Sequence, residues 1–196
     1  MKNIIGNVLM SFAILGWIKA EIVFPEDGVT LNYTHIMFRW TQEPDCNLYN
    51  LVVINSSNDT TMDIHTGRTM YIDQTNFNWG QGYVAMLTPI YENENNVQTI
   101  DTISFNIGPA YTFADLNIEI INAEDTQDGL ALFSQVSPNF RMVAIDKLGN
   151  QVWNSEFAYI NHWNEHGQLF GMKDGRGVEV NFYDDILWMT PLGTEI

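Results

Sequence analysis

The residues best suited to chemistry lie in one short run, His162-Trp163-Asn164-Glu165-His166. The run spells the H-x-x-E-H pattern of zinc peptidases, in which two histidines bind one metal ion and the glutamate acts as general base. That chemistry needs a helix, because helical turns stack side chains four residues apart on one face. Asn161 before the run, Asn164 within it and the following Gly167 disfavour a helix. We therefore expect a loop with no metal and no cofactor, with His162 as a candidate binding residue; a zinc site is the alternative.

A second run, Lys173-Asp174-Gly175-Arg176-Gly177, gathers two basic residues around two glycines. Exposed backbone amides beside cationic side chains can hold a sulfate or phosphate group. A plain β-hairpin turn explains the same residues, and the spacing is not that of a nucleotide-binding loop. We keep both interpretations, and Lys173 and Arg176 join His162 as candidate binding residues.

From Phe24 to Ile107 the sequence alternates short apolar runs with Asn, Asp, Gly and Thr. No stretch repeats apolar residues at the 3.6-residue spacing of a helix for long. This pattern predicts β-strands. The expected strands are Ile36–Trp40, Leu48–Asn55, Thr69–Ile72, Gly82–Pro89 and Thr102–Ile107.

The order of these features resembles an immunoglobulin-like or fibronectin type III domain over residues 21–108. The matching features are a Pro-rich opening turn at residues 25–28, a tryptophan strand containing Phe38-Arg39-Trp40, and a tyrosine strand beginning Gly82-Tyr83. The resemblance implies a two-sheet sandwich and no particular chemistry.

After Gly108-Pro109 the sequence pattern changes and predicts short strands separated by tight turns. The run from Ile145 to Trp153 aligns with Met189 to Ile196, and the two Leu-Gly pairs lie 44 positions apart. That spacing is typical of β-propeller blades, where the turn reverses the chain and the tryptophan packs between sheets. We therefore predict that residues 109–196 are the first blades of a truncated propeller.

Composition restricts the function classes. Twenty-four acidic and eight basic residues give a net charge of −16, which disfavours nucleic acids and anionic membranes as partners. Residues 1–20 combine Lys2 with an apolar stretch, the pattern of a secretory signal peptide, so we expect a secreted, periplasmic or cell-surface protein with no membrane association after cleavage. Cys46 is the only cysteine, which rules out an intrachain disulfide.

Three segments of the second region resemble the first blades of arylsulfotransferases: residues 129–133, residues 142–153, and His162 followed by residues 167–170. The resemblance implies an exported enzyme that moves a sulfuryl group from a phenolic sulfate ester to another phenol through a sulfated histidine. Its small phenolic donors and acceptors would be the partners, and the catalytic residues are expected beyond Ile196, so the fragment is predicted to be inactive. The alternative is a non-catalytic secreted propeller or sandwich that binds glycans or proteins.

Overall fold

The computed structural model describes residues 19–91, 100–111, 124, 129–135, 141–156, 158–164 and 168–191. Within them the chain forms strands β1 to β15 and no helix, which confirms the all-β prediction for these residues. Accordingly, this part of the chain contains no helix long and apolar enough to cross a lipid bilayer. The predicted signal peptide lies outside the described residues, apart from Lys19 and Ala20 at its end.

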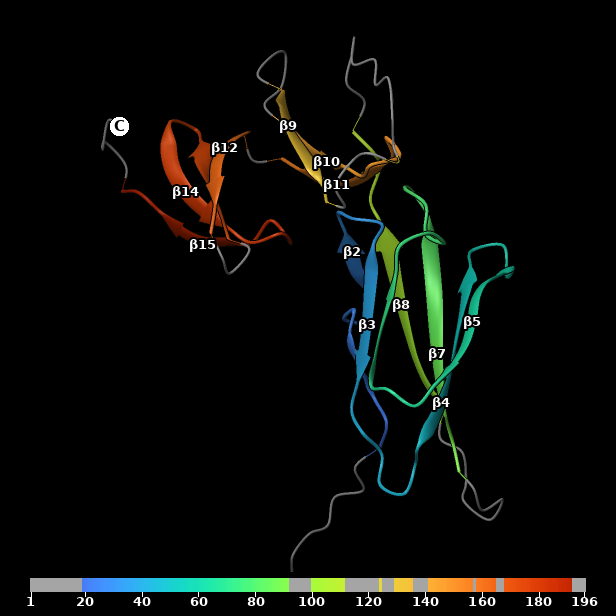
Figure 1. The fold of residues 1–196 in the computed structure, drawn as a ribbon. Coiled ribbons are helices and arrows are strands. Elements are labelled where there is room, and N and C mark those ends of the chain that lie inside the picture. Colours follow the sequence, from blue (N-terminus) through green and yellow to red (C-terminus); the bar gives the residue numbers. More distant parts are fainter. Residues whose placement is uncertain are drawn as a thin grey trace, which may run out of the picture.

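The first region is a sandwich of two sheets (Figure 1). The three-stranded sheet has the order β1 (Ile22–Phe24), β3 (Ile36–Trp40), β6 (Met70–Asp73). The five-stranded sheet has the order β2 (Val29–Leu31), β8 (Asp101–Ile107), β7 (Gly82–Ile90), β4 (Leu48–Asn55), β5 (Thr60–Thr66). All pairings are antiparallel except that of β2 with β8. This crossed strand order is that of immunoglobulin-like sandwiches.

The core of the sandwich follows from strand alternation. In β7 every second residue is buried, from Tyr83 to Pro89, and β4 and β8 alternate in the same way. Aromatic rings join the two sheets, because Phe38 packs edge-on against Phe105 at 5.9 Å and Trp40 against Tyr49 at 5.7 Å. The buried face of each strand therefore meets the other sheet, as the predicted sandwich requires.

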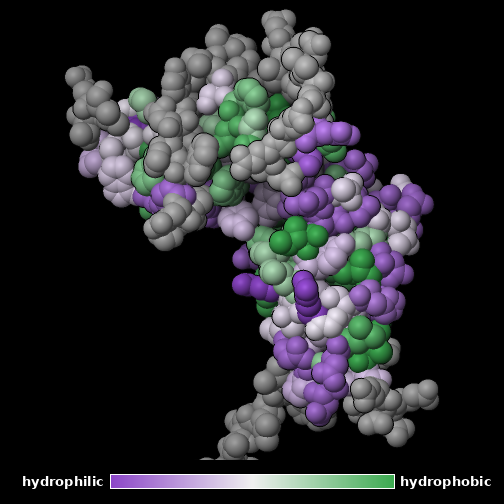
Figure 2. All heavy atoms as spheres, viewed as in Figure 1, coloured by the Kyte–Doolittle hydropathy of each residue, from purple (hydrophilic) through white to green (hydrophobic). Residues whose placement is uncertain are grey.

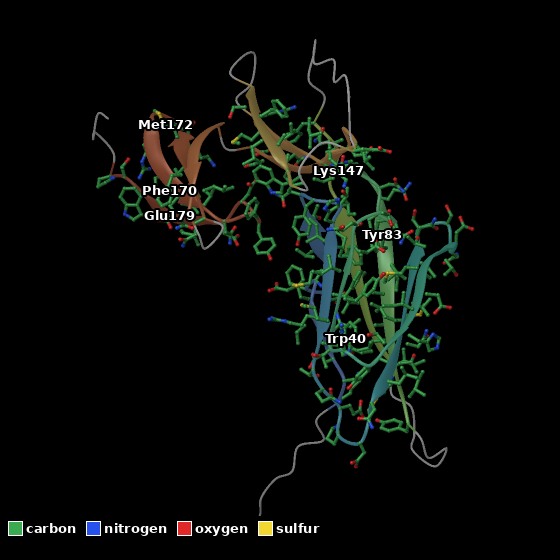
Figure 3. All side chains as sticks on the ribbon, viewed as in Figure 1. Trp40, Tyr83, Lys147, Phe170, Met172 and Glu179 are labelled. Atoms are coloured by element: carbon green, nitrogen blue, oxygen red, sulfur yellow. The ribbon has the colours of Figure 1, made fainter. Side chains whose placement is uncertain are left out.

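The predicted tryptophan and tyrosine strands are β3 and β7 (Figure 3). Trp40 is 3% exposed and lies in the core. The hydroxyl of Tyr83 accepts a hydrogen bond from the backbone N–H of Asn78 at 2.9 Å and lies 3.3 Å from Oε1 of Gln81. A tyrosine at the start of this strand that bonds back to the preceding loop is a hallmark of immunoglobulin-like sandwiches.

The second region consists of two antiparallel sheets with neighbouring strands joined in chain order. The first has the order β11 (Gln151–Ser155), β10 (Arg141–Ile145), β9 (Ala131–Gln135). The second runs β12 (Ala158–Trp163), β13 (Leu169–Lys173), β14 (Arg176–Val180), β15 (Ile186–Met189). In the described residues these sheets stay open and do not close into a ring, so the structure shows two all-β regions, and the propeller stays a prediction.

One core joins the two sheets of the second region. Trp153 is 3% exposed and packs with residues of both sheets, among them Met142 and Leu169. The expectation that this tryptophan lies between sheets is confirmed. In Figure 1 the β9–β11 sheet lies at one end of the sandwich, and the β12–β15 sheet lies beside it.

Three of the hairpin turns share one construction, in which the side chain of the first residue caps the loop. Asp146 Oδ1 accepts the backbone N–H groups of Leu148 and Asn150, both at 2.8 Å. Gly149 has a φ of 84°, the left-handed conformation that the predicted turn needs. The same bonds recur at Asn55 and at Asn181, whose loops carry a left-handed Asn58 and a left-handed Asp184. Local turn chemistry therefore sets the register of three hairpins.

The five strands predicted for the first region match β3, β4, β6, β7 and β8 within one residue, but β1, β2 and β5 are missed there, and β12 is missed in the second region. Strands β1 and β2 are only three residues long, too short for a detectable alternation. Strand β5 is mostly polar, because it lies at a sheet edge and buries little more than Met62. Strand β12 includes His162 and Trp163, the first two residues of the H-x-x-E-H run, which the sequence analysis interprets as a loop. Both strands contain strand-favouring residues, such as Ile64 in β5 and Ile160 in β12, but no clear apolar alternation by which the sequence could reveal them.

Candidate functional site

The three predicted binding residues all belong to the β12–β15 sheet. His162 lies in strand β12, with its backbone opposite Phe170. The loop expected there is thus wrong for His162, and so is the helix that a zinc site would need; His166 lies outside the described residues. In the part of the chain that the structure describes, no three His, Cys, Asp or Glu side chains gather closely enough to hold a metal ion.

Lys173 and Arg176 pair across a two-residue hairpin turn between β13 and β14. Asp174 and Gly175 have φ values of 51° and 72°, so the hairpin interpretation of this run is confirmed. Arg176 donates from Nε to the carbonyl of Thr190 at 2.7 Å and from Nη2 to the same oxygen. Its guanidinium therefore ties β14 to the end of β15, and a role for Lys173 or Arg176 in anion binding stays a prediction.

A cleft of about 250 Å³ lies elsewhere, where the sandwich meets the second region. Five of its lining residues are aromatic and come from four separate segments of the chain. The lining residues are Phe24, Tyr33, His35, Met37, Leu130, Val152, Trp153, Phe182 and Tyr183. Most of the lining is thus apolar, and none of the three predicted binding residues belongs to it.

A short β-ladder between the two regions creates this cleft. Residues 32–34 precede β3 and run antiparallel to β11, with Tyr33 opposite Trp153. The N–H of Thr34 donates to the carbonyl of Val152, and the N–H of Asn154 to that of Asn32, both at 2.9 Å. These bonds pair backbone groups of a loop that would otherwise need water, and they bring the Tyr33 and Trp153 side chains into one wall.

Two side-chain bonds strengthen the junction. The amide of Asn32 donates to the carbonyl of Asn154 at 2.8 Å. The indole N–H of Trp79, in the loop before β7, donates to the carbonyl of Gln151 at 2.8 Å. The sandwich therefore holds β11 at several points along its length.

The rings of the cleft hold one another at fixed tilts. Tyr183 lies 5.8 Å from Phe24 and 5.7 Å from Tyr33 between ring centroids, at interplanar angles of 54° and 53°. The ring of Phe182 meets Trp153 edge-on at 5.7 Å, and the Trp153 indole N–H donates to the Phe182 carbonyl at 2.7 Å. The β14–β15 turn is thereby fastened over the cleft, with Tyr183 still 49% exposed.

The polar groups of the cleft are few. The hydroxyl oxygen of Tyr33 is buried and has no hydrogen-bond partner among the described residues. Burial, and to a lesser extent the neighbouring Tyr183, raise the pKa of Tyr33, so its hydroxyl stays neutral at physiological pH. Among the described residues of the lining, the one ionisable side chain besides the two tyrosines is His35.

Carboxylates lie beside the cleft. Burial raises the pKa of Asp184, which directly follows Tyr183, although Ser155 and the backbone of Glu156 act to lower it. Its Oδ1 atom is buried without a hydrogen-bond partner in the described part of the chain. Partial burial also acts to raise the pKa of Asp146, but bonds from Asn150 and Leu148, with the charge of His35, lower it overall. Asp146 thus stays ionised near the cleft.

No protein-family model and no curated protein matches this sequence. Among solved structures, a two-domain fibronectin type III segment from chicken tenascin is similar, at 15% identity and a TM-score of 0.32. The similarity covers 86% of this chain and 97% of that one. So low a TM-score carries no argument, and the fold rests on the strand order described above.

Proposed function

We propose that this chain is a non-catalytic binding protein whose ligand places a ring or a compact apolar group in the junction cleft. The observation that carries the proposal is the convergence of five aromatic side chains from four chain segments on one open cleft. Concave, mostly apolar sites with a few oriented polar groups are the usual form of small-ligand sites.

The exposure of the cleft residues supports binding over core packing. Phe182 and Tyr183 are 36% and 49% exposed, and Leu130 is 48% exposed. Large apolar side chains gathered around a hollow and left in water mark interaction sites more often than isolated exposed ones do. The junction ladder fixes Tyr33 and Trp153, and these two side chains contact Tyr183 and Phe182 in turn, so a ligand would order few additional side chains on binding.

The chemistry of the lining favours a ring or apolar group over an extended glycan. A sugar offers many hydroxyl groups, and each needs a partner when it is buried. The lining residues provide Tyr33 and His35 as their main polar groups. The sequence analysis names glycans and proteins as the partners of a binding protein. A protein side chain or a small molecule with a compact apolar group therefore fits this lining better than a glycan.

The test is ligand-observed NMR with the chain and a probe panel of phenol, choline and methyl glucoside. We expect at least one of phenol and choline to bind, and the Tyr183→Ala variant to weaken that binding. Trp188→Ala is the matched control, because Trp188 is an aromatic residue, 53% exposed, outside the cleft lining. Binding of no probe, or equal binding by both variants, would overturn the proposal.

A second candidate is the propeller of an arylsulfotransferase-like enzyme. The four-stranded meander β12–β15 fits a propeller blade, and two of its exposed apolar residues, Met172 and Trp188, are 38% and 53% exposed. Figure 3 labels Met172, with Phe170 and Glu179, on this sheet. A further blade packed on this sheet would bury such residues.

The enzyme proposal is tested with a longer reading frame. The extended protein should transfer sulfate from a chromogenic aryl sulfate to phenol, and the transfer should depend on a histidine beyond Ile196. An extended protein that lacks this activity, with no cluster of histidines downstream, would end the enzyme proposal and leave the binding proposal standing.

A further inference from the structure

We propose that the group held in the junction cleft is an organic cation of the alkylammonium class, such as a trimethylammonium group. This inference rests on the proposed binding function and names its ligand class. It draws on the ring arrangement, on the charge beside the cleft and on the unpaired Tyr33 hydroxyl.

The ring arrangement fits a compact cation. Ring faces carry negative electrostatic potential, and a cation within about 6 Å of a ring centroid is attracted to it. Phe24 and Tyr33 both lie within 6 Å of Tyr183, tilted by 54° and 53° and not stacked flat. The three rings thus form one tilted cluster in the cleft lining, and a cation lying against a face of this cluster gains the attraction by which aromatic cages bind quaternary ammonium groups.

The chain uses the same interaction within its own fold. The Arg141 guanidinium lies 4.4 Å from the centroid of the Tyr111 ring. The Arg141 side chain thus lies over an aromatic ring at the start of β10, and the Arg176 guanidinium donates hydrogen bonds to the Thr190 carbonyl. Neither guanidinium is therefore free to fill the cleft in place of a ligand.

The charge around the cleft selects a cation over an anion or a neutral ring. The turn that contributes Phe182 and Tyr183 continues directly into Asp184 and Asp185. Asp146, whose pKa is lowered, stays ionised beside the cleft. The whole chain carries a net charge of −16, so its field attracts cations and repels anions. Figure 2 shows hydrophilic residues over much of the visible face of the sandwich.

The Tyr33 hydroxyl indicates which kind of group should lie next to the ammonium group in the ligand. It is buried at the wall and unpaired in the described structure, so a ligand atom that pairs with it relieves a desolvated polar group. A hydroxyl or ester oxygen near the ammonium group has the matching chemistry. Choline carries both features and is a suitable probe.

The deciding experiment compares choline with 3,3-dimethylbutan-1-ol, a neutral molecule of the same shape in which carbon replaces the charged nitrogen. Titration of the whole chain followed by NMR should give choline an affinity about 5- to 10-fold higher, the range expected for a partly desolvated cation–π site. Equal affinities would overturn the cation inference while leaving a binding cleft. If neither compound nor phenol binds, the proposed function fails as well.

Variants at Tyr183 separate ring chemistry from fold. Tyr183→Phe keeps an aromatic face and should retain the preference for choline, whereas Tyr183→Leu should lose most of it. Because Tyr183 is 49% exposed, both variants are expected to fold, and circular dichroism checks this. Trp188→Leu, outside the cleft lining, serves as the control and should leave both affinities unchanged. A Tyr183→Leu protein that keeps the full preference for choline would contradict the inference.

Discussion

Two buried tryptophans allow the contribution of one hydrogen bond beside the cleft to the free energy of unfolding to be measured. Trp153 and Trp40 are both 3% exposed. The indole N–H of Trp153 donates to the Phe182 carbonyl at 2.7 Å, whereas the indole N–H of Trp40 is buried with no partner among the described residues. Replacing each by phenylalanine removes a similar volume, but only Trp153→Phe breaks a hydrogen bond.

The expected difference follows from this contrast. Both variants lose part of a buried ring, a cost that is a fraction of the about 3–5 kcal/mol typical of a large aromatic residue replaced by alanine. Trp153→Phe also loses a hydrogen bond worth about 1 kcal/mol and leaves a carbonyl to find water. Trp40→Phe removes an unpaired polar group, which offsets part of its cost. Trp153→Phe should therefore lower the free energy of unfolding by about 1–2 kcal/mol more than Trp40→Phe.

Urea unfolding followed by far-ultraviolet circular dichroism measures the two free energies. A difference of 1 kcal/mol corresponds to about 2–4 °C in Tm for a chain of this size. If the two regions unfold separately, each variant is compared with the parent in its own transition, at an unchanged m-value. Trp188→Phe, at a residue 53% exposed, is the control and should change stability by less than about 0.5 kcal/mol. A Trp40→Phe cost equal to or above that of Trp153→Phe would refute the reasoning.

Three further outcomes are expected. Tyr83→Phe should destabilise the sandwich by about 1–2 kcal/mol in urea unfolding, because the Asn78 N–H loses its acceptor; a change below 0.3 kcal/mol would count against that bond. Burial raises the pKa of Asp184, so the folded chain holds this proton more tightly and stability falls as pH rises through the raised pKa. Asparagine tolerates the left-handed φ of 64° at this position. Asp184→Asn should therefore raise the free energy of unfolding at pH 7 and lose this gain in acid. A gain that stays constant from pH 4 to 7 would contradict the reasoning. Asp146→Ala should cost about 1 kcal/mol through two lost amide bonds, with Asp146→Asn as a near-neutral control; equal losses for both would mean that the charge matters more than the cap.

Much of the fold was predictable because it follows from local patterns. Alternation in β4 and β7 identified strands whose buried faces form the sandwich core. The Leu148-Gly149 turn and the Trp153 position followed from the internal repeat, because a left-handed glycine and an aspartate cap act within five residues. These signals need no knowledge of distant partners.

The predictions that failed concern residues that depend on a distant partner. His162 lies on a strand because β12 pairs with β13; the loop prediction rested on Asn161 and Asn164, although Ile160 and Trp163 favour a strand. Arg176 is bound to the Thr190 carbonyl, a contact that the basic run by itself does not indicate.

The sequence by itself determined the all-β class, most strands and the capped hairpins, since backbone alternation and turn chemistry act over a few residues. Only the tertiary structure decided the candidate site. Phe24, Tyr33, Trp153 and Tyr183 stand far apart in the chain and carry no common motif. They meet because backbone groups of residues 32–34 pair with β11, a contact across more than a hundred residues that no local pattern encodes.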